Sequence, residues 1–140
     1  MTGPKRLTAA ELQAAFLRSP FVAFLRLEDI AFAPDGAVAA RLRLRPELER
    51  GAGTGQFHGG PIASLIDIVG DLAVAAAVGG GVPTINFRTD FLKPAIGPAL
   101  VARGLARRVG RTIAVADVDV MDDKGGLVAI GRGTYSTQVG

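Results

Sequence analysis

The chain has no cysteine and only one histidine among its 140 residues. The absence of cysteine excludes disulfide bonds, thiolate metal ligands and a cysteine nucleophile, and it leaves the redox compartment open. With one histidine and scattered carboxylates, no metal-ligand cluster is expected, and no cofactor is implied. No apolar signal core follows the N-terminal Met-Thr-Gly-Pro-Lys-Arg, so a cytoplasmic location is expected.

A run of basic residues is also missing, although the net charge is +3. A looser cluster occurs at Arg103, Arg107, Arg108 and Arg111. Arginines at solvated strand ends are the ordinary explanation, and the phosphates of a small ligand are the alternative. Nucleic acid is the weaker option, because no stretch rich in aromatic residues lies near these arginines and no helix–turn–helix or zinc pattern is present.

Length and composition predict one globular domain over residues 1–140, since 49% of the residues are apolar. The longest apolar segment, residues 61–78, is long enough to raise the question of a membrane span. It contains Asp67 and Asp71, and each would cost roughly a few kcal/mol in lipid. No membrane association is therefore expected.

The chain is organised around residues 55–78, which begin as a glycine-rich loop and continue as that apolar segment. His58 stands at the junction. Pro61 suits the first turn of a helix, because its missing N–H would be unpaired there. Three glycines at 79–81 end the segment. We expect a helix over about residues 60–78, apolar nearly all round and therefore buried.

The polar residues of this helix are Ser64, Asp67 and Asp71, whose spacing of i, i+3 and i+7 places them on one face. A carboxylate on a buried helix needs hydrogen-bond partners, or its pKa rises. Two interpretations have equal weight. Both aspartates bind backbone groups of a neighbouring loop, or one of them lines a cleft as a base or nucleophile.

The rest of the chain predicts one short helix and six strands. Thr8-Ala-Ala-Glu11 is a capping box that opens a helix over about residues 8–18, and Ser19-Pro20 ends it. Strands are expected at residues 21–33, 37–45, 84–92, 100–109, 112–121 and 127–137. In the second of these, one face is apolar and the other largely charged.

Short connections between the later strands require antiparallel pairing. Those strands are rich in alanine and glycine, which suits a sheet that curves closely around a helix. The expected class is therefore α+β, with an antiparallel sheet of five to six strands wrapped around one long helix. A sheet edge or face is left over, which predicts an oligomer.

Two segments carry a family resemblance. His58-Gly59-Gly60 followed by Asp67, and Thr84-Ile-Asn-Phe-Arg-Thr-Asp-Phe-Leu-Lys-Pro-Ala95, resemble the hotdog-fold acyl-CoA thioesterases of the PaaI type. The resemblance extends over nearly the whole chain. It implies the hotdog fold and hydrolysis of an acyl-CoA thioester to a free acid and CoA.

The resemblance also implies roles for single residues. Asp67 matches the general base or nucleophile, and Gly59 matches the glycine whose backbone N–H polarises the thioester carbonyl. His58 matches the histidine that shapes this loop, and Thr84 lies near a Ser/Thr position that holds the attacking water. The expected substrate contacts are Gly60, Gln56 and Ser64, with Arg107 and Arg108 at the phosphates of CoA.

Two positions depart from the family pattern. Ala52 stands where the family commonly has asparagine or glutamine, with Gln56 and Thr54 as the nearby substitutes. Asp71 stands where the family generally has a small residue. The change at Ala52 motivates an alternative function, a non-catalytic acyl-CoA-binding or regulatory hotdog protein. A hotdog dehydratase is disfavoured, because its chemistry needs a histidine and a carboxylate acting together on the acyl chain.

Gly59 and Asp67 are eight residues apart, so a helix separates them by ~12 Å along its axis. A donor to the carbonyl oxygen and a base at the carbonyl carbon must each lie within ~3–3.5 Å of their atoms. One chain cannot easily bring both groups to one thioester. Two antiparallel helices across a two-fold axis can. We expect a homodimer with shared active sites, or a homotetramer that contains it.

Overall fold

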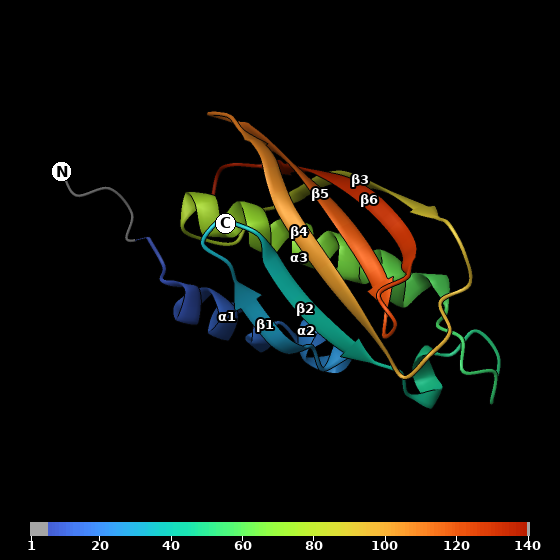
Figure 1. Ribbon diagram of the computed structural model, residues 1–140. Helices are drawn as coiled ribbons and strands as arrows, with labels where there is room; N and C mark the ends of the chain where they lie inside the picture. The colour runs from blue at the N-terminus through green and yellow to red at the C-terminus, as the bar shows by residue number, and fades with distance from the viewer. Residues whose placement is uncertain (1–5, 140) are drawn as a thin grey trace.

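One antiparallel sheet of six strands packs against one long helix, α3 (Gly59–Val78), in the computed structural model, which describes residues 6–139 (Figure 1). The strand order across the sheet is β1-β2-β4-β5-β6-β3. The strands are β1 (Glu28–Phe32), β2 (Val38–Arg43), β3 (Thr84–Phe91), β4 (Ala99–Val109), β5 (Ile113–Asp122) and β6 (Leu127–Ser136). The predicted α+β class and the sheet around one helix are confirmed.

Two short helices, α1 (Ala9–Arg18) and α2 (Pro20–Leu25), precede the sheet, and a single 3-10 turn, η1 (Pro46–Leu48), follows β2. The predicted capping box opens α1. The Thr8 side chain accepts a hydrogen bond from the Glu11 backbone, and the Glu11 side chain accepts one from the Thr8 backbone. α1 and α3 each begin within one residue of the predicted position.

α3 is long and apolar enough to span a membrane by length and composition alone, with a mean hydropathy of 1.8. Its apolar side chains have another place in this fold, because Leu65, Ile66 and Val69 are fully buried in the core beneath the sheet. Packing against the sheet therefore accounts for the composition of α3.

Glycines on the sheet let it approach α3 closely. A Cβ atom on Gly104 of β4 would lie 2.9 Å from the Val69 side chain, and one on Gly131 of β6 would lie 2.4 Å from the Ile66 side chain. Both distances are below van der Waals contact, so any larger residue would push the sheet away from the helix. The small residues of the later strands serve the close curvature that the sequence predicts.

Tyr135 of β6 is buried between the sheet and α3. A Cβ atom on Gly70 would lie 2.2 Å from the Tyr135 hydroxyl, and one on Gly133 would lie 2.3 Å from it. The two glycines thus form a slot for the phenol ring. Tyr135 Oη donates a hydrogen bond of 3.0 Å to the backbone carbonyl of Asp67. Burial, with the nearby carboxylates of Asp67 and Asp71, raises the pKa of this hydroxyl.

One prediction was wrong. Residues 21–33, expected as a strand, form α2 (Pro20–Leu25) and then β1 from Glu28. Pro20 occupies the first turn of α2, where a missing N–H costs nothing. Arg26, with a left-handed φ of 59°, ends the helix. An apolar run of this length suits a strand or a buried helix, so periodicity could not decide.

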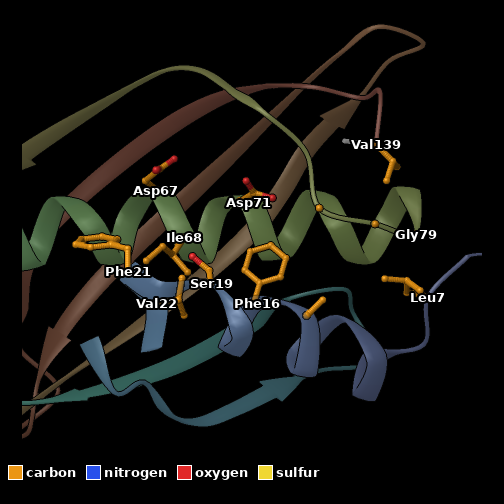
Figure 2. Close-up of a pocket in the computed structure, with 13 residues that line it drawn as sticks. Leu7, Phe16, Ser19, Phe21, Val22, Asp67, Ile68, Asp71, Gly79 and Val139 are labelled. Atoms are coloured by element: carbon orange, nitrogen blue, oxygen red, sulfur yellow. The ribbon is translucent and has the colours of Figure 1, made fainter. Parts of the chain in front are cut away.

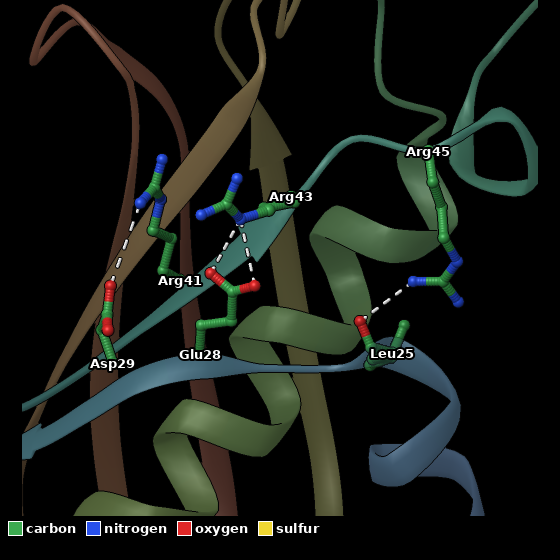
Figure 3. Close-up of polar contacts among 6 residues, drawn as sticks. All are labelled: Leu25, Glu28, Asp29, Arg41, Arg43 and Arg45. Atoms are coloured by element: carbon green, nitrogen blue, oxygen red, sulfur yellow. Dashed lines mark hydrogen bonds and ion pairs between the residues drawn. The ribbon is translucent and has the colours of Figure 1, made fainter.

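Arg45 provides a tertiary reason for this helix. Its guanidinium donates a hydrogen bond of 3.0 Å to the carbonyl of Leu25 (Figure 3). It also donates to the carbonyl of Phe24 and lies 4.7 Å from the centre of that ring. The last turn of a helix leaves such carbonyls without intrahelical partners. A residue on a separate segment therefore completes the end of α2.

The charged face predicted for residues 37–45 is present on β2, which spans Val38–Arg43. Arg43 pairs with Glu28 of β1 at 2.9 Å, and Arg41 lies 3.9 Å from Asp29 (Figure 3). These pairs are exposed and contribute little stability. They give the outer face of the sheet a hydrated surface.

Candidate active site

Asp67 lies at the middle of α3 and faces the beginning of β3. Thr84 Oγ1 donates a hydrogen bond of 2.7 Å to Asp67 Oδ1. The Tyr135 hydroxyl donates a hydrogen bond to the backbone carbonyl of the same aspartate. The structure thus brings together two of the predicted catalytic residues, Asp67 and Thr84, and fixes the position of the first.

His58 is the N-cap residue of α3. Its Nδ1 accepts a hydrogen bond of 3.2 Å from the Gly60 backbone N–H, and its own backbone N–H donates to the Leu48 carbonyl at 2.8 Å. An accepting Nδ1 places the proton of the neutral ring on Nε2. Gly59 is the first residue of the helix, so its N–H has no intrahelical acceptor and is available to a ligand.

Gly59 lines a cleft of about 360 Å³, which we call the Gly59 cleft. A Cβ atom on Gly59 would lie 3.2 Å from the Phe91 ring, so a larger residue would crowd the cleft. Arg50 and Lys93 also line it, and Lys93 is 3.5 Å from Asp122. Arg50 forms no side-chain ion pair or hydrogen bond with residues 6–139.

Of the two residues expected to replace the amide missing at Ala52, only one lines the Gly59 cleft. Thr54 is engaged within its loop, where its hydroxyl donates to the Gly51 carbonyl at 2.7 Å. Gln56 lines the cleft beside Gly59. A residue with an amide side chain therefore lines this cleft, although at another sequence position.

A second, larger cavity of about 560 Å³ lies between α1, α2 and α3, and we call it the Asp67 pocket (Figure 2). Most of its wall is apolar, with Phe16, Phe21 and Ile68 among the lining residues. Asp67 and Asp71 line it from α3, and their carboxyl groups point to the same side of the helix (Figure 2).

Asp71 differs from Asp67 in its partner. Asp71 Oδ1 accepts a hydrogen bond of 3.2 Å from the Val82 N–H, in the loop after α3. Burial raises the pKa of the Asp71 carboxyl, the Val82 N–H lowers it, and the negative charge of Asp67 raises it by a smaller amount, which leaves the pKa at about 7. The loop-backbone interpretation therefore describes Asp71, whereas Asp67 is bound by a side-chain hydroxyl.

Residues 54–129 match the model of the thioesterase superfamily. The chain belongs to this superfamily. An esterase candidate from Halobacterium salinarum is 38% identical over 114 residues, which are 74% of this chain and 75% of that protein.

Solved structures of thioesterases have the same fold. A thioesterase from Haemophilus influenzae has a TM-score of 0.80 at 25% identity, covering 97% of this chain and 94% of that chain. The PaaI protein of the E. coli phenylacetic acid degradation operon has a TM-score of 0.78 at 22% identity, with 94% of both chains covered. The hotdog-fold resemblance seen in the sequence is confirmed.

Other predicted contacts of this thioesterase-superfamily chain lie elsewhere. The Ser64 hydroxyl donates to the Gly60 carbonyl at 2.9 Å and is satisfied within the helix. Arg107 and Arg108 lie at the end of β4, far along the sheet from the Gly59 cleft, and Arg107 is 3.6 Å from Asp117. A single chain brings neither arginine to that cleft or to the Asp67 pocket.

Sequence reasoning missed Arg50, Lys93 and Tyr135 as parts of the two sites. Lys93 belongs to the Leu-Lys-Pro turn that carried the family resemblance, so a signal for it was present. Tyr135 is the only tyrosine, and its partner Gly70 is the only glycine of α3 beyond the first two residues of that helix. No group of three His, Asp or Glu residues within positions 6–139 is close enough to hold a metal ion.

Proposed function

We propose that the protein hydrolyses an acyl-CoA thioester to a free carboxylic acid and CoA. The Asp67–Thr84 hydrogen bond at the wall of an apolar pocket carries this proposal, because it holds a carboxylate and a hydroxyl where a water molecule can bind both. Membership of the thioesterase superfamily supports the reaction class.

The reaction follows from these groups. Asp67 accepts a proton from a water molecule while the oxygen of that water attacks the thioester carbonyl carbon. The Gly59 N–H stabilises the negative charge that develops on the carbonyl oxygen. The carbon–sulfur bond then breaks, and the CoA thiolate takes up the proton that Asp67 received. Direct attack by Asp67 is the other route, with an anhydride that water then hydrolyses.

Two copies of the chain form each site in this proposal. α3 is unbroken between Gly59 and Asp67, which keeps them ~12 Å apart within one chain. β3 is an edge strand that exposes Ile85 (53%), Phe87 (40%) and Phe91 (57%). An exposed apolar edge favours pairing with another copy. Antiparallel α3 helices would then place the Gly59 cleft of one copy beside the Asp67 pocket of the other.

The two cavities suit the two parts of an acyl-CoA. The apolar Asp67 pocket suits the acyl group. The Gly59 cleft offers Arg50 and Lys93 to the phosphates of CoA. A non-catalytic acyl-CoA-binding protein is the second candidate, because Ala52 lacks the amide that the family commonly places there.

The test is thiol release from a panel of acyl-CoAs by the wild type, Asp67→Asn and a control, Asp119→Asn, on the outer face of β5. We expect Asp67→Asn to lower kcat by about 100-fold or more, while the control keeps wild-type turnover. Saturable binding without thiol release would favour the non-catalytic candidate. Near-normal turnover in Asp67→Asn would make Asp71 the candidate base.

A further inference from the structure

The Asp67 pocket contains more polar groups than a plain alkyl chain requires. Its wall is mainly apolar, yet Asp71 and Ser19 line it in addition to Asp67. A carboxyl group buried next to apolar atoms is costly unless a hydrogen-bonding partner reaches it. The hydrogen-bond partners of Asp71 and Ser19 therefore indicate which kind of ligand the pocket binds.

Asp71 uses only one of its two carboxyl oxygens. Oδ1 accepts the Val82 N–H, and Oδ2 forms no hydrogen bond with residues 6–139. Within that part of the chain, Thr89 Oγ1 is the one fully enclosed side-chain oxygen that lacks a partner. Oδ2 of Asp71 is therefore accessible, and a bound molecule in the pocket can reach it.

Ser19, which also lines this pocket, likewise has a side-chain oxygen without an internal hydrogen-bond partner. It is the N-cap residue of α2, but its side chain makes no capping hydrogen bond. Its hydroxyl forms no other hydrogen bond with the residues that the structure describes, and Figure 2 shows it directed toward α3. One apolar pocket is thus lined by two side chains that each have an oxygen without a partner among residues 6–139, Oδ2 of Asp71 on α3 and Oγ of Ser19 before α2.

We propose that Asp71 determines substrate specificity by forming a hydrogen bond with a hydroxyl group on the acyl chain of the substrate. This inference rests on the proposed hydrolysis of acyl-CoA. Asp67 and Asp71 are four residues apart, or ~6 Å along α3. With the thioester carbonyl at Asp67, the hydroxyl is then about five to six bonds away from that carbonyl.

A hydroxyl fits Asp71 better than other groups do. It donates to an ionised carboxylate and accepts from a protonated carboxyl, so it pairs with Asp71 in either state. An amine pairs only with the ionised form. A methyl group of the same size covers Asp71 Oδ2 without forming a hydrogen bond to it, and this penalty disfavours the unsubstituted chain. Ser19 lines the same pocket and offers its hydroxyl as a second partner.

The test compares 6-hydroxyhexanoyl-CoA with heptanoyl-CoA, which has a methyl group in place of the hydroxyl. The readout is the ratio of kcat/KM for the two substrates in the wild type, Asp71→Ala and Asp71→Asn. This ratio does not depend on the fraction of folded protein, so a loss of stability cannot imitate the effect. Asp119→Ala is the control, because that carboxylate is exposed on the outer face of β5.

We expect the wild type and the control to prefer the hydroxylated substrate by about tenfold or more. Asp71→Ala should abolish this preference, and Asp71→Asn should keep part of it, since an amide still pairs with a hydroxyl. Equal hydrolysis of both substrates by the wild type, or an unchanged ratio in Asp71→Ala, overturns the assignment. Absence of thiol release from every acyl-CoA overturns the proposed function and this assignment with it.

Discussion

Asp71 should make the stability of this fold fall as pH rises from about 4 to about 7. Burial raises the pKa of its carboxyl from 3.8 to about 7. Between these two values the folded chain keeps a proton on Asp71 that the unfolded chain releases. Since the folded state binds more protons there, the free energy of unfolding decreases with pH. Carboxylates with a lowered pKa, such as Asp117, have the opposite effect at lower pH.

Each unit of difference between the folded-state and unfolded-state pKa changes the free energy of unfolding by about 1.4 kcal/mol. The rise from 3.8 to about 7 corresponds to a loss on the order of 4 kcal/mol. The stabilising effect of the bound proton is complete below the unfolded pKa and absent above the folded one. Asp71→Asn cannot titrate and keeps an oxygen for the Val82 N–H. The variant should therefore exceed the wild type in stability at pH 8, with little difference near pH 4.

Urea denaturation at about pH 4.5, 6 and 8 measures this difference, with protein concentration fixed because an oligomer is expected. Subtracting wild type from variant cancels the other titrating groups. Asp119→Asn, which removes an exposed carboxylate, should give a difference that is nearly independent of pH. If Asp71→Asn behaves like this control, or is less stable than the wild type at pH 8, Asp71 is not held in a protonated form by burial.

Two further predictions concern substrate binding and assembly. Arg50→Ala should raise KM for acyl-CoA more than it lowers kcat, with no such rise for an acyl-pantetheine, which lacks the nucleotide phosphates. The same assay on Arg107→Ala and Arg108→Ala tests whether the end of β4 binds CoA. An unchanged KM in either variant removes that arginine from the site. Mixing inactive Asp67→Asn and Gly59→Pro proteins should restore each hybrid dimer toward half of wild-type activity, because one of its two sites then carries neither defect. Proline suits the first position of α3, removes the N–H and adds a ring beside Phe91, so it disables the Gly59 site of its own chain. Verified subunit exchange without recovery would mean that each chain builds its site alone.

Local signals in the sequence were enough to predict α3 and its burial. Its apolar composition, the proline near its start and the glycines after its end act within the segment itself. The same holds for α1, whose capping box is complete within four residues. The catalytic roles predicted for Thr84 and Asp67 came from the family resemblance, and the structure adds their hydrogen bond, which no local rule predicts for residues so far apart in the chain.

Long-range contacts decided the features that sequence reasoning missed. The apolar residues of α2 suit either a helix or a strand, and Arg45, 20 residues beyond Leu25, binds the end of the helix. The slot for Tyr135 likewise needs Gly70 on α3 and Gly133 on β6. Such long-range contacts leave no periodic pattern in the sequence, so they cannot be predicted from one sequence alone.

The two aspartates of α3 show how environment separates residues that spacing cannot. They are identical in type and lie on one face, four residues apart. Asp67 meets a hydroxyl at the open edge strand β3, whereas Asp71 is bound by the Val82 N–H beneath the loop after α3. The negative charge of Asp67 adds to burial in favouring the protonated form of Asp71, so below about pH 7 most molecules carry a proton on Asp71. The division of roles that we propose, a base at Asp67 and a hydrogen-bonding group at Asp71, rests on this difference in surroundings.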